Sequence, residues 1–258
     1  MTFCSIIATY NNQGTLAGVI ERTLEAMEGH VIVVNDGCTD RSSEILGRYA
    51  DNDRVSVVSY EKNRGKGYAL CEGFAEARRL GYDYAVTLDS DGQHFPEDIG
   101  NLTAVAEKEI AAGEKRIIVV GSRNLSAEGM PKGNRFANRF GNFWFHVQTW
   151  QPLSDTQTGF RLYTLSSMPS RRFITNRYEA ELEMLVFSAW RGVKLREAPV
   201  RVYYAPKGER VSHFRPFADF MRIFALNTVL FFAALLYGYP SMAIRKLRVI
   251  RVKKGRFA

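Results

Sequence analysis

The alternation of short β-branched runs with longer amphipathic stretches over the first 125 residues most constrains the fold. Candidate strands are Phe3–Thr9, Val31–Asn35, Val55–Tyr60, Tyr84–Leu88 and Ile117–Gly121. Stretches of helical character lie between them, near residues 14–27, 41–50, 66–80 and 97–112. Strands that alternate with helices pair in parallel through right-handed crossovers. The pattern therefore predicts an α/β fold with a mostly parallel central sheet flanked by helices.

Polar residues follow the candidate strands at the points where those strands are expected to end. Thr9-Tyr10-Asn11-Asn12 follows the first strand, Asn35-Asp36-Gly37 the second, Asp89-Ser90-Asp91 the fourth and Gly121-Ser122-Arg123 the fifth. Ligands of open α/β sheets bind at the carboxyl ends of the strands. These motifs predict a ligand site at that end of the sheet. Further on, we expect a loop, a helix and a loop over residues 124–160, a helix at 178–191 and an extended segment at 193–204.

The composition is that of an ordinary globular protein, with 46% hydrophobic and 24% charged residues. The N-terminus runs directly into the first candidate strand without a basic segment or a cleavage site, so no signal peptide is predicted. Cys4, Cys38 and Cys71 are far apart and lack a C-x-x-C spacing. They disfavour a disulfide framework or a zinc site and favour a reducing, cytoplasmic compartment.

Asp89 and Asp91 are the sharpest chemical signal in the sequence. Two carboxylates one residue apart at the end of a strand can reach one small region. Mg²⁺ and Mn²⁺ prefer oxygen ligands and share their coordination with phosphates. We therefore expect one of these ions to be held by Asp91 and Asp89, where it would neutralise a diphosphate leaving group. The structural alternative is a polar turn, because D-x-D-G is common in turns.

Four motifs in order place the two aspartates in context: Val33–Asp40, Asn63–Gly67, Leu88–His94 and Asp155–Arg161. Together they resemble glycosyltransferase family 2, and most closely its dolichyl-phosphate-mannose-synthase-like branch, which includes bacterial polyisoprenyl-phosphate glycosyltransferases. The resemblance implies a GT-A fold and an inverting transfer of sugar from a UDP- or GDP-sugar. It implies a polyisoprenyl phosphate as acceptor. The alternative acceptor is a hydroxyl of a glycolipid or of a growing cell-envelope polysaccharide.

The resemblance also assigns residues to the donor. It implies that the base and ribose are held by Thr9, Tyr10, Asn11 and Asp36. Lys66 is expected near the donor phosphates, and Asp89 with Ser90 near the ribose and diphosphate, while Asp91 ligates the metal directly. Gly65 and Gly67 are expected to allow close backbone approach. Asn35 and Asn12 depart from the family pattern, which has an aspartate and a glutamate there, and the nucleotide's identity stays open.

The acceptor in this branch is a lipid phosphate that is already anionic, so it needs orienting arginines rather than a strong general base. The candidates are Arg123, Arg135, Arg139 and Arg161. Arg135 and Arg139 are four residues apart and would share one face of a helix. For a hydroxyl acceptor, Asp155 would be the base, although it could equally fix the loop 154–161 by hydrogen bonds. Glu181, with Glu179 as second choice, is expected at the acceptor end.

A loop near the end of the catalytic region resembles the one that closes over the donor diphosphate in this branch. Its candidate phosphate contacts are Arg210, Ser212, His213 and Arg215. We therefore expect residues 1–220 to form a catalytic domain, with a nucleotide-sugar-binding half at 1–123 and an acceptor-binding half with the closing loop at 124–220. Residues 221–258 are expected to associate with a membrane.

The charge distribution supports that last expectation. The chain has a net charge of +8, and residues 221–258 hold eight basic residues and no acidic one, so the rest of the chain is balanced. The basic residues flank the apolar run Ile223–Tyr237, which is shorter than the roughly 20 residues of a spanning helix and is soon followed by Pro240. A buried core helix and a tilted partial insertion remain open. The basic flank favours an interfacial helix on anionic lipids at the cytoplasmic face of the cell membrane, peripheral or monotopic, rather than nucleic-acid binding.

Other classes of protein fit less well. A Rossmann oxidoreductase would need G-x-G-x-x-G after the first strand, where this chain has Tyr10-Asn-Asn-Gln-Gly14. A nucleotidyltransferase would need a glycine-rich basic signature within the first 25 residues, and none is present. A non-catalytic binding module is disfavoured because Asp89, Asp91 and Arg161 are all in place.

Overall fold

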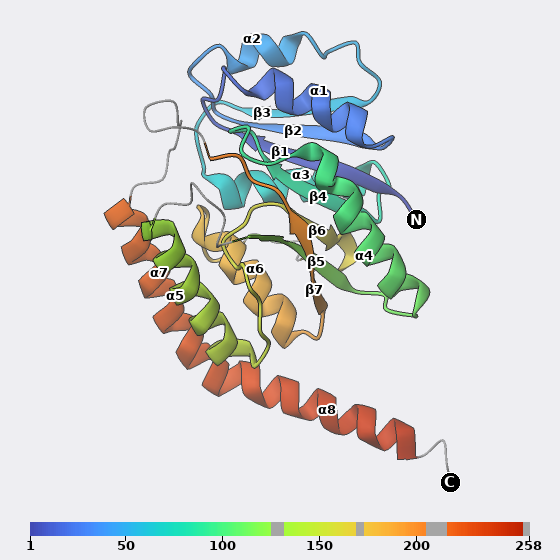
Figure 1. Ribbon diagram of the computed structural model, residues 1–258, viewed down its shortest axis with the longest axis vertical. Helices are drawn as coiled ribbons and strands as arrows, with labels where there is room; N and C mark the ends of the chain where they lie inside the picture. The colour runs from blue at the N-terminus through green and yellow to red at the C-terminus, as the bar shows by residue number, and fades with distance from the viewer. Residues whose placement is uncertain (125–131, 169–172, 205–215, 255–258) are drawn as a thin grey trace.

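The centre of the molecule is a seven-stranded sheet with the order β3-β2-β1-β4-β6-β5-β7 (Figure 1). The computed structural model describes residues 1–124, 132–168, 173–204 and 216–254. The strands are β1 Phe3–Thr9, β2 His30–Asp36, β3 Val55–Tyr60, β4 Tyr84–Asp89, β5 Ile117–Arg123, β6 Arg161–Thr164 and β7 Lys194–Val200. Strands β3, β2, β1 and β4 pair in parallel, as do β5 and β7. The predicted α/β fold with a mostly parallel sheet is confirmed.

Strand β6 is the element that the sequence analysis missed. Its four residues pair antiparallel with β4 on one side and with β5 on the other, so that Leu162 lies opposite both Val86 and Val119. This strand joins the two parallel parts of the sheet. A four-residue segment that begins with an arginine has no alternating pattern of its own, and only its two partners make it a strand.

Helices cover both faces of the sheet (Figure 1). Helices α1 Leu16–Ala26, α2 Ser42–Gly47 and α4 Ile99–Ala111 cover one face, and α3 Lys66–Arg79 and α6 Glu179–Trp190 cover the other. Helices α5 Lys132–Thr149 and α7 Pro216–Ala233 lie side by side against α6. Two short 3₁₀ segments, Pro96–Asp98 and Leu165–Ser167, complete this part of the chain. The helices predicted near 14–27, 41–50, 66–80, 97–112 and 178–191 are confirmed.

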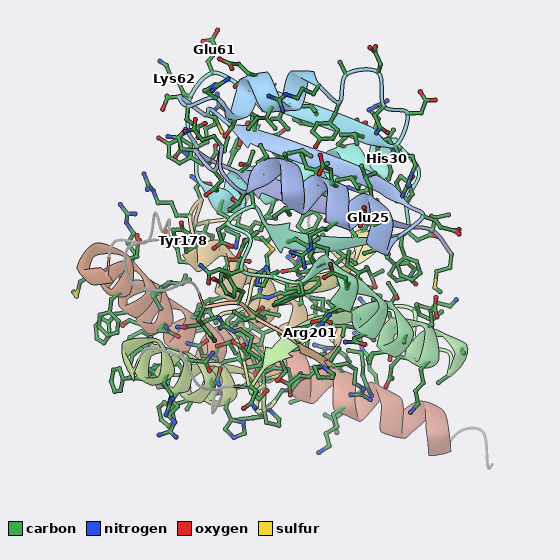
Figure 2. The ribbon with its side chains drawn as sticks, turned by 45° about the horizontal axis from the view of Figure 1, so that its top comes forward. Glu25, His30, Glu61, Lys62, Tyr178 and Arg201 are labelled. Atoms are coloured by element: carbon green, nitrogen blue, oxygen red, sulfur yellow. The ribbon has the colours of Figure 1, made fainter. Side chains whose placement is uncertain are left out.

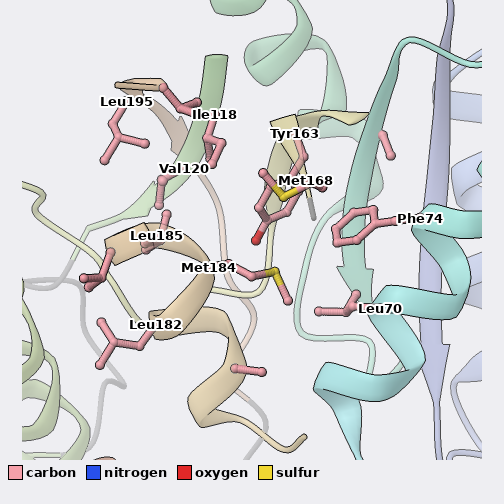
Figure 3. Close-up of a cluster of buried hydrophobic side chains, with 14 of the residues drawn as sticks. Leu70, Phe74, Ile118, Val120, Tyr163, Met168, Leu182, Met184, Leu185 and Leu195 are labelled. Atoms are coloured by element: carbon pink, nitrogen blue, oxygen red, sulfur yellow. The ribbon is translucent and has the colours of Figure 1, made fainter. Parts of the chain in front are cut away.

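The core consists of two apolar layers, one on each face of the sheet. Neighbouring strand residues alternate between them, because successive side chains of a strand point to opposite faces: Ile6 belongs to one layer and Ile7 to the other. Figure 3 shows the layer under α3 and α6, where Phe74, Tyr163 and Met184 meet. Each fully buried side chain of this size contributes roughly 1.5–3 kcal/mol, so these layers fix the strand ends that carry the polar motifs.

The apolar run near the C-terminus belongs to a helix longer than the sequence suggested. Helix α7 continues through a π-helical segment, Ala234–Gly238, into α8 Tyr239–Lys254. The predicted C-terminal apolar helix is confirmed, and it continues past Pro240: Asp219–Arg248 is one helix of 30 residues, long and apolar enough to cross a bilayer by length and composition. Proline lacks an N–H and its ring crowds the preceding turn, and the wide π turn just before Pro240 removes that conflict. Of the most apolar 18-residue stretch of this helix, 22% is buried inside the protein.

Gly67 provides a test of how tightly the two halves of the fold meet. A Cβ there would collide with the Cβ of Ala180 on α6. We expect Gly67→Ala to lower the free energy of unfolding by about 1–3 kcal/mol, the usual effect of overpacking, as measured by urea denaturation. Gly18→Ala, an exposed position in α1 with nothing within 4 Å of its Cβ, is the control and should raise it by about 0.5–1 kcal/mol. Equal effects of the two changes would contradict this packing.

Candidate active site

The loops after β1 and β2 are joined to each other by side chains. The Asn11 amide oxygen accepts hydrogen bonds from the backbone N–H groups of Thr39 at 2.8 Å and Asp40 at 3.3 Å. Asn11 has a positive φ of 53°, a conformation that asparagine tolerates. Thr9 is buried at the end of β1, and Tyr10 is half-buried beside it. The predicted nucleotide residues therefore form one rigid rim at the carboxyl end of the sheet.

Asp36 shapes the next loop of the rim. Its buried carboxylate accepts hydrogen bonds from Arg64 N at 2.7 Å, Gly65 N at 3.0 Å and the Asn63 amide at 2.9 Å. Burial raises the pKa of Asp36, and the backbone N–H groups act against that rise. Asp36 thus holds the Asn63–Gly67 motif in place, in addition to any contact with a base. The close approach expected of Gly65 and Gly67 is to residues 176–180 at the start of α6, which a Cβ on either glycine would strike.

Lys66 lies at the centre of the site, at the first residue of α3. Its ammonium is 2.5 Å from Asp89 Oδ1 and 2.9 Å from Glu181 Oε2, so it links the end of β4 to α6. The backbone of Gly159 covers this pair: a Cβ there would lie 2.6 Å from Lys66 Nζ and 2.7 Å from Asp89 Oδ2. The motifs 63–67, 88–94 and 155–161 therefore converge on one ammonium group.

The charges of Lys66, Asp89 and Glu181 stabilise one another. Burial disfavours the ammonium form of Lys66, but Asp89 and Glu181 outweigh that effect and raise its pKa. Burial likewise disfavours the carboxylate of Asp89, and Lys66 outweighs it and lowers the pKa. Both groups are charged at neutral pH. Glu181 keeps a second buried oxygen, Oε1, with no hydrogen bond among the described residues.

Asp91 and Ser90 follow in the turn after β4. The Asp91 Oδ1 accepts a hydrogen bond from Gln93 N at 3.0 Å, and Gly92 takes the positive φ of 74° that this turn requires. Ser90 is buried; its hydroxyl accepts from the Asn12 amide at 2.8 Å, and its carbonyl accepts from the Thr15 hydroxyl at 2.6 Å. Asn12, which departs from the family pattern, therefore ties the first loop to the aspartate turn.

The donor atoms here fit a hard divalent cation that is shared with a phosphate ligand. Asp89 and Asp91 offer oxygen atoms only. Among the described residues, no three His, Cys, Asp or Glu side chains form a group that could hold a metal ion. Mg²⁺ characteristically takes one or two carboxylates and completes its shell with water and substrate phosphates. Asp89 also binds Lys66, so a cation held here would share that carboxylate with the ammonium group.

His94 is a site residue that the sequence analysis passed over. It is buried, its ring lies 5.2 Å from the Phe160 ring, and its Nδ1 accepts the backbone N–H of Asp89 at 3.4 Å. Burial lowers the pKa of His94 to about 4, so the ring is neutral at physiological pH and holds the backbone of Asp89. The sequence signal for His94 was its position at the end of the motif Leu88–His94. For Gly159, the signal was its position after Thr158 in the motif Asp155–Arg161.

Asp155 lies in the loop 154–161 and is completely buried. Its carboxylate accepts from Arg123 Nε at 2.5 Å and Nη2 at 2.8 Å, and from the Asn138 amide at 2.6 Å. It also accepts from Gln157 N at 3.2 Å, within its own loop. Asp155 therefore joins β5, α5 and the loop 154–161, which is the positioning role named as its alternative.

Arg161 and the acids of α6 also lie inside the protein. Arg161 is fully buried and donates to the carbonyls of Thr156 at 2.8 Å and Glu181 at 2.7 Å. Glu179 is buried near the same end of α6. Glu183 is buried too, and accepts from Ile174 N and Thr175 N, which closes the loop before the helix. Arg161 is thus a support for the site rather than a group on its surface.

Helix α5 presents Arg135 and Arg139 on one side, as their spacing predicts, beside an exposed aromatic surface. Arg139 is exposed and Arg135 half-buried. Phe136 and Phe143 on the same helix are 64% and 59% exposed, and Trp150, directly after its last residue, is 61% exposed. The neighbouring α7 extends this surface with Phe224, Val229 and Phe232. Aromatic contacts between Phe140 and Phe220 and between Trp144 and Phe231 hold the two helices together.

The predicted site residues thus fall into three groups. Thr9, Tyr10, Asn11, Asp36, Lys66, Asp89, Ser90, Asp91 and Glu181 come together at the carboxyl ends of β1, β2 and β4 and the start of α6. Arg123, Asp155 and Arg161 lie under the adjacent loop, with Arg135 and Arg139 on α5. Arg210, Ser212, His213 and Arg215 lie outside the described residues. Figure 2 shows Tyr178 between the N-terminal strands and α7, with Glu61 and Lys62 at the far rim.

This fold and site define a nucleotide-sugar transferase of the GT-A type, and the chain belongs to glycosyl transferase family 2, which it matches over residues 4–179. It is 26% identical over 217 residues to the UDP-N-acetylglucosamine–dolichyl-phosphate N-acetylglucosaminyltransferase of Methanococcus voltae, covering 77% of this chain and 84% of the relative. It is 27% identical to the undecaprenyl-phosphate mannosyltransferase of Micrococcus luteus, over 81% and 86% of the two chains.

A solved structure shares the fold. Glucosyl-3-phosphoglycerate synthase from Mycobacterium tuberculosis, in complex with Mn²⁺, UDP and phosphoglyceric acid, superimposes with a TM-score of 0.63 at 19% identity. The match covers 91% of this chain and 77% of that one. The predicted family and fold are confirmed, and the chain is a glycosyltransferase.

Lys66→Met tests whether the central ion pairs hold the two halves together. It leaves Asp89 and Glu181 without their cation, and we expect a loss of about 3 kcal/mol in unfolding free energy near neutral pH. The stability that Asp89 gains from its lowered pKa is present above about pH 4 and is lost as the pH falls further. The difference between variant and wild type should therefore shrink toward pH 3. Lys62→Met, at the exposed rim, is the control (Figure 2); a pH-independent difference for Lys66→Met would contradict the ion-pair account.

Proposed function

We propose that this enzyme transfers a sugar from a UDP- or GDP-sugar to a polyisoprenyl phosphate at a membrane surface. The observation that carries the proposal is helix α5. It is tied to the loop 154–161 through Asn138 and Asp155, carries Arg135 and Arg139, and exposes Phe136 and Phe143, with the exposed Trp150 directly after its end. An acceptor with an anionic head and a hydrocarbon tail needs both features on one element. The names of the relatives from Methanococcus and Micrococcus support the same acceptor class.

On the donor side, the rim at Thr9–Asn11 and Asp36 would hold the nucleotide, with Asp89 and Ser90 near the ribose and diphosphate. Asp91, with Asp89, would hold Mg²⁺ or Mn²⁺, which would neutralise charge on the diphosphate leaving group. Lys66 fixes Asp89 and brings a second positive charge to the phosphates. Arg210, Ser212, His213 and Arg215 are proposed to close over the donor.

On the acceptor side, a phosphate oxygen would attack the anomeric carbon in a single displacement that inverts its configuration. A phosphate is already ionised at neutral pH, so the step needs no general base. This agrees with the carboxylate of Asp155, which is locked by Arg123 and Asn138. Arg135 and Arg139 would orient the phosphate, and Glu181 would lie at the acceptor end, where Lys66 holds its carboxylate.

Residues 221–258, with the exposed faces of α5 and α7, would hold the enzyme on the cytoplasmic face of the cell membrane. Burial of the apolar faces in the bilayer would contribute roughly 25 cal/mol per Å² to the free energy of membrane binding. Each basic residue near anionic lipid would add about 1 kcal/mol. The catalytic domain would comprise residues 1–220, with donor and acceptor halves meeting near residue 123.

The metal assignment predicts that Asp91→Ala abolishes metal-dependent donor binding while the protein stays folded. Titration calorimetry with UDP- and GDP-sugars, with and without Mn²⁺, measures this directly, and far-UV circular dichroism checks the fold. Asp53→Ala, an exposed aspartate on the loop before β3, should leave binding unchanged. Metal-dependent affinity that survives in Asp91→Ala would remove Asp91 as a ligand.

The acceptor assignment predicts product with a short polyprenyl phosphate and none with the matching polyprenol, over a panel of donors read by mass spectrometry. Arg139→Gln should raise the KM for polyprenyl phosphate about tenfold or more, the effect of losing a charge-assisted hydrogen bond, with donor binding unchanged. Arg48→Gln, an exposed arginine on the other face of the sheet, is the control. Transfer to the alcohol alone would instead favour the hydroxyl acceptor.

A further inference from the structure

The segment Arg201–Tyr204, which follows β7, lies against the turn after β4. Val202 forms an antiparallel bridge with His94, and the backbone N–H of Tyr203 donates to the Gln93 carbonyl at 2.8 Å. The backbone of this segment is therefore fixed at the carboxyl end of the sheet, beside the proposed donor site.

Arg201 holds the start of the segment. Its backbone N–H donates to Asp98 Oδ2 at 2.6 Å, and its guanidinium lies 2.8 Å from Asp98 Oδ1. The same guanidinium lies 4.9 Å from the centroid of the Phe95 ring. On the side of the segment, these contacts and the two above involve only backbone atoms and the Arg201 side chain. Changes to the side chains of Tyr203 and Tyr204 therefore leave them in place.

The two tyrosines of the segment lie on opposite sides of it. Exposure alternates from Arg201 to Tyr204, as it does where neighbouring residues of an extended chain point in opposite directions. Tyr203 is 51% exposed, whereas the Tyr204 hydroxyl is buried and has no hydrogen-bond partner within the described residues. A buried hydroxyl without a partner lowers stability, and such a group calls for an explanation, for example a bound ligand.

Arg123 lies close enough to Tyr204 for the two side chains to interact electrostatically. Burial disfavours the guanidinium form of Arg123, but Asp155 and Tyr204 act against that effect, and the pKa of Arg123 is raised. Asp155 accepts hydrogen bonds from Nε and Nη2 of Arg123. In the part of the chain that the structure describes, Nη1 donates no hydrogen bond, and 15% of the side chain is exposed. An unpaired hydroxyl and an unused guanidinium N–H group thus lie in one region.

The position of Arg123 indicates which phosphate would bind there. Asp155 connects Arg123 to Asn138 of α5, the helix that carries Arg135 and Arg139. The donor phosphates are instead proposed to lie at the end of β4 and the start of α3, so the acceptor phosphate is the better match. The terminal oxygens of a phosphate monoester accept hydrogen bonds and carry negative charge, which suits a hydroxyl and a guanidinium together.

We propose that Tyr204 binds the acceptor phosphate: its hydroxyl donates to one phosphate oxygen while Arg123 Nη1 donates to another. The proposal rests on the polyisoprenyl phosphate acceptor given under the proposed function. Because Asp155 fixes the guanidinium and backbone contacts fix the segment, the two donors hold the phosphate in one orientation. Tyr204 is then a substrate-binding residue whose hydroxyl gains its partner when the acceptor binds.

The test compares Tyr204→Phe, which removes only the hydroxyl, with Tyr203→Phe, the same change on the exposed side of the segment. We expect Tyr204→Phe to raise the KM for a short polyprenyl phosphate about tenfold or more, the effect of losing a hydrogen bond to a charged group. Affinity for UDP and GDP, measured by titration calorimetry, should not change. The midpoint of thermal unfolding without acceptor should rise by about 2 °C or more, because a buried unpaired hydroxyl is removed. Tyr203→Phe should change none of these quantities.

The outcomes separate the alternatives. A lower unfolding midpoint with an unchanged KM for Tyr204→Phe would indicate a structural hydroxyl and overturn the proposal. Weaker binding of UDP or GDP with an unchanged KM would assign the hydroxyl to the donor diphosphate and overturn it as well. Equal rises in KM for both variants would contradict it, because the effect would not depend on the buried hydroxyl. If wild type transfers sugar to polyprenyl phosphate and Tyr204→Phe has the same KM, only this contact is overturned. If wild type makes no such product, the proposed acceptor fails and this contact fails with it.

Discussion

The ion pairs of Lys66 with Asp89 and Glu181 are the interaction on which the site depends. A lysine, an aspartate and a glutamate with little exposure can lie together only because each satisfies the others, and removal of one partner leaves a buried charge. These ion pairs also limit which residues can lie next to them. Residue 159 must be a glycine, because any side chain would occupy the space of the ammonium and carboxylate. Gly65 and Gly67 must be small so that α3 can approach α6 closely enough for the contact to form.

The aspartates, the arginine-bearing helix α5 and the exposed apolar surface of α7 form one spatial series. The rim proposed to bind the donor lies at the carboxyl ends of β1, β2 and β4, and the buried Asp155 connects β5 to α5. Helix α5 then lies against α7 through aromatic rings and through Gln148, which donates to Asn227. Each step is a direct contact, so in the proposed membrane-bound enzyme a shift of α7 would reach the arginines of α5 through packing rather than through a flexible linker.

Sequence patterns predicted the parts of this molecule that local rules govern. Strands β1 to β5, their helices and the polar strand ends follow from alternation and from the place of ligands in parallel sheets. Local rules could not predict contacts between distant segments. Strand β6 has no pattern of its own, the burial of Arg161 depends on carbonyls of Thr156 and Glu181, and the role of Gly159 appears only when Lys66 and Asp89 lie beside it. The continuous helix through Pro240 depends on a π turn that propensities do not encode.

The antiparallel strand β6 has a consequence for how the chain folds as it is made. Strand β4 has β1 on one side, and its other edge is covered only by β6, which begins at Arg161. Strand β5 also needs β6 to join the rest of the sheet. Until that short segment leaves the ribosome, the nascent chain therefore carries unpaired strand edges composed of Val, Ile and Ala, the kind of surface that pairs with other chains. Once in place, four residues close both edges at once, and the two parallel parts of the sheet become one.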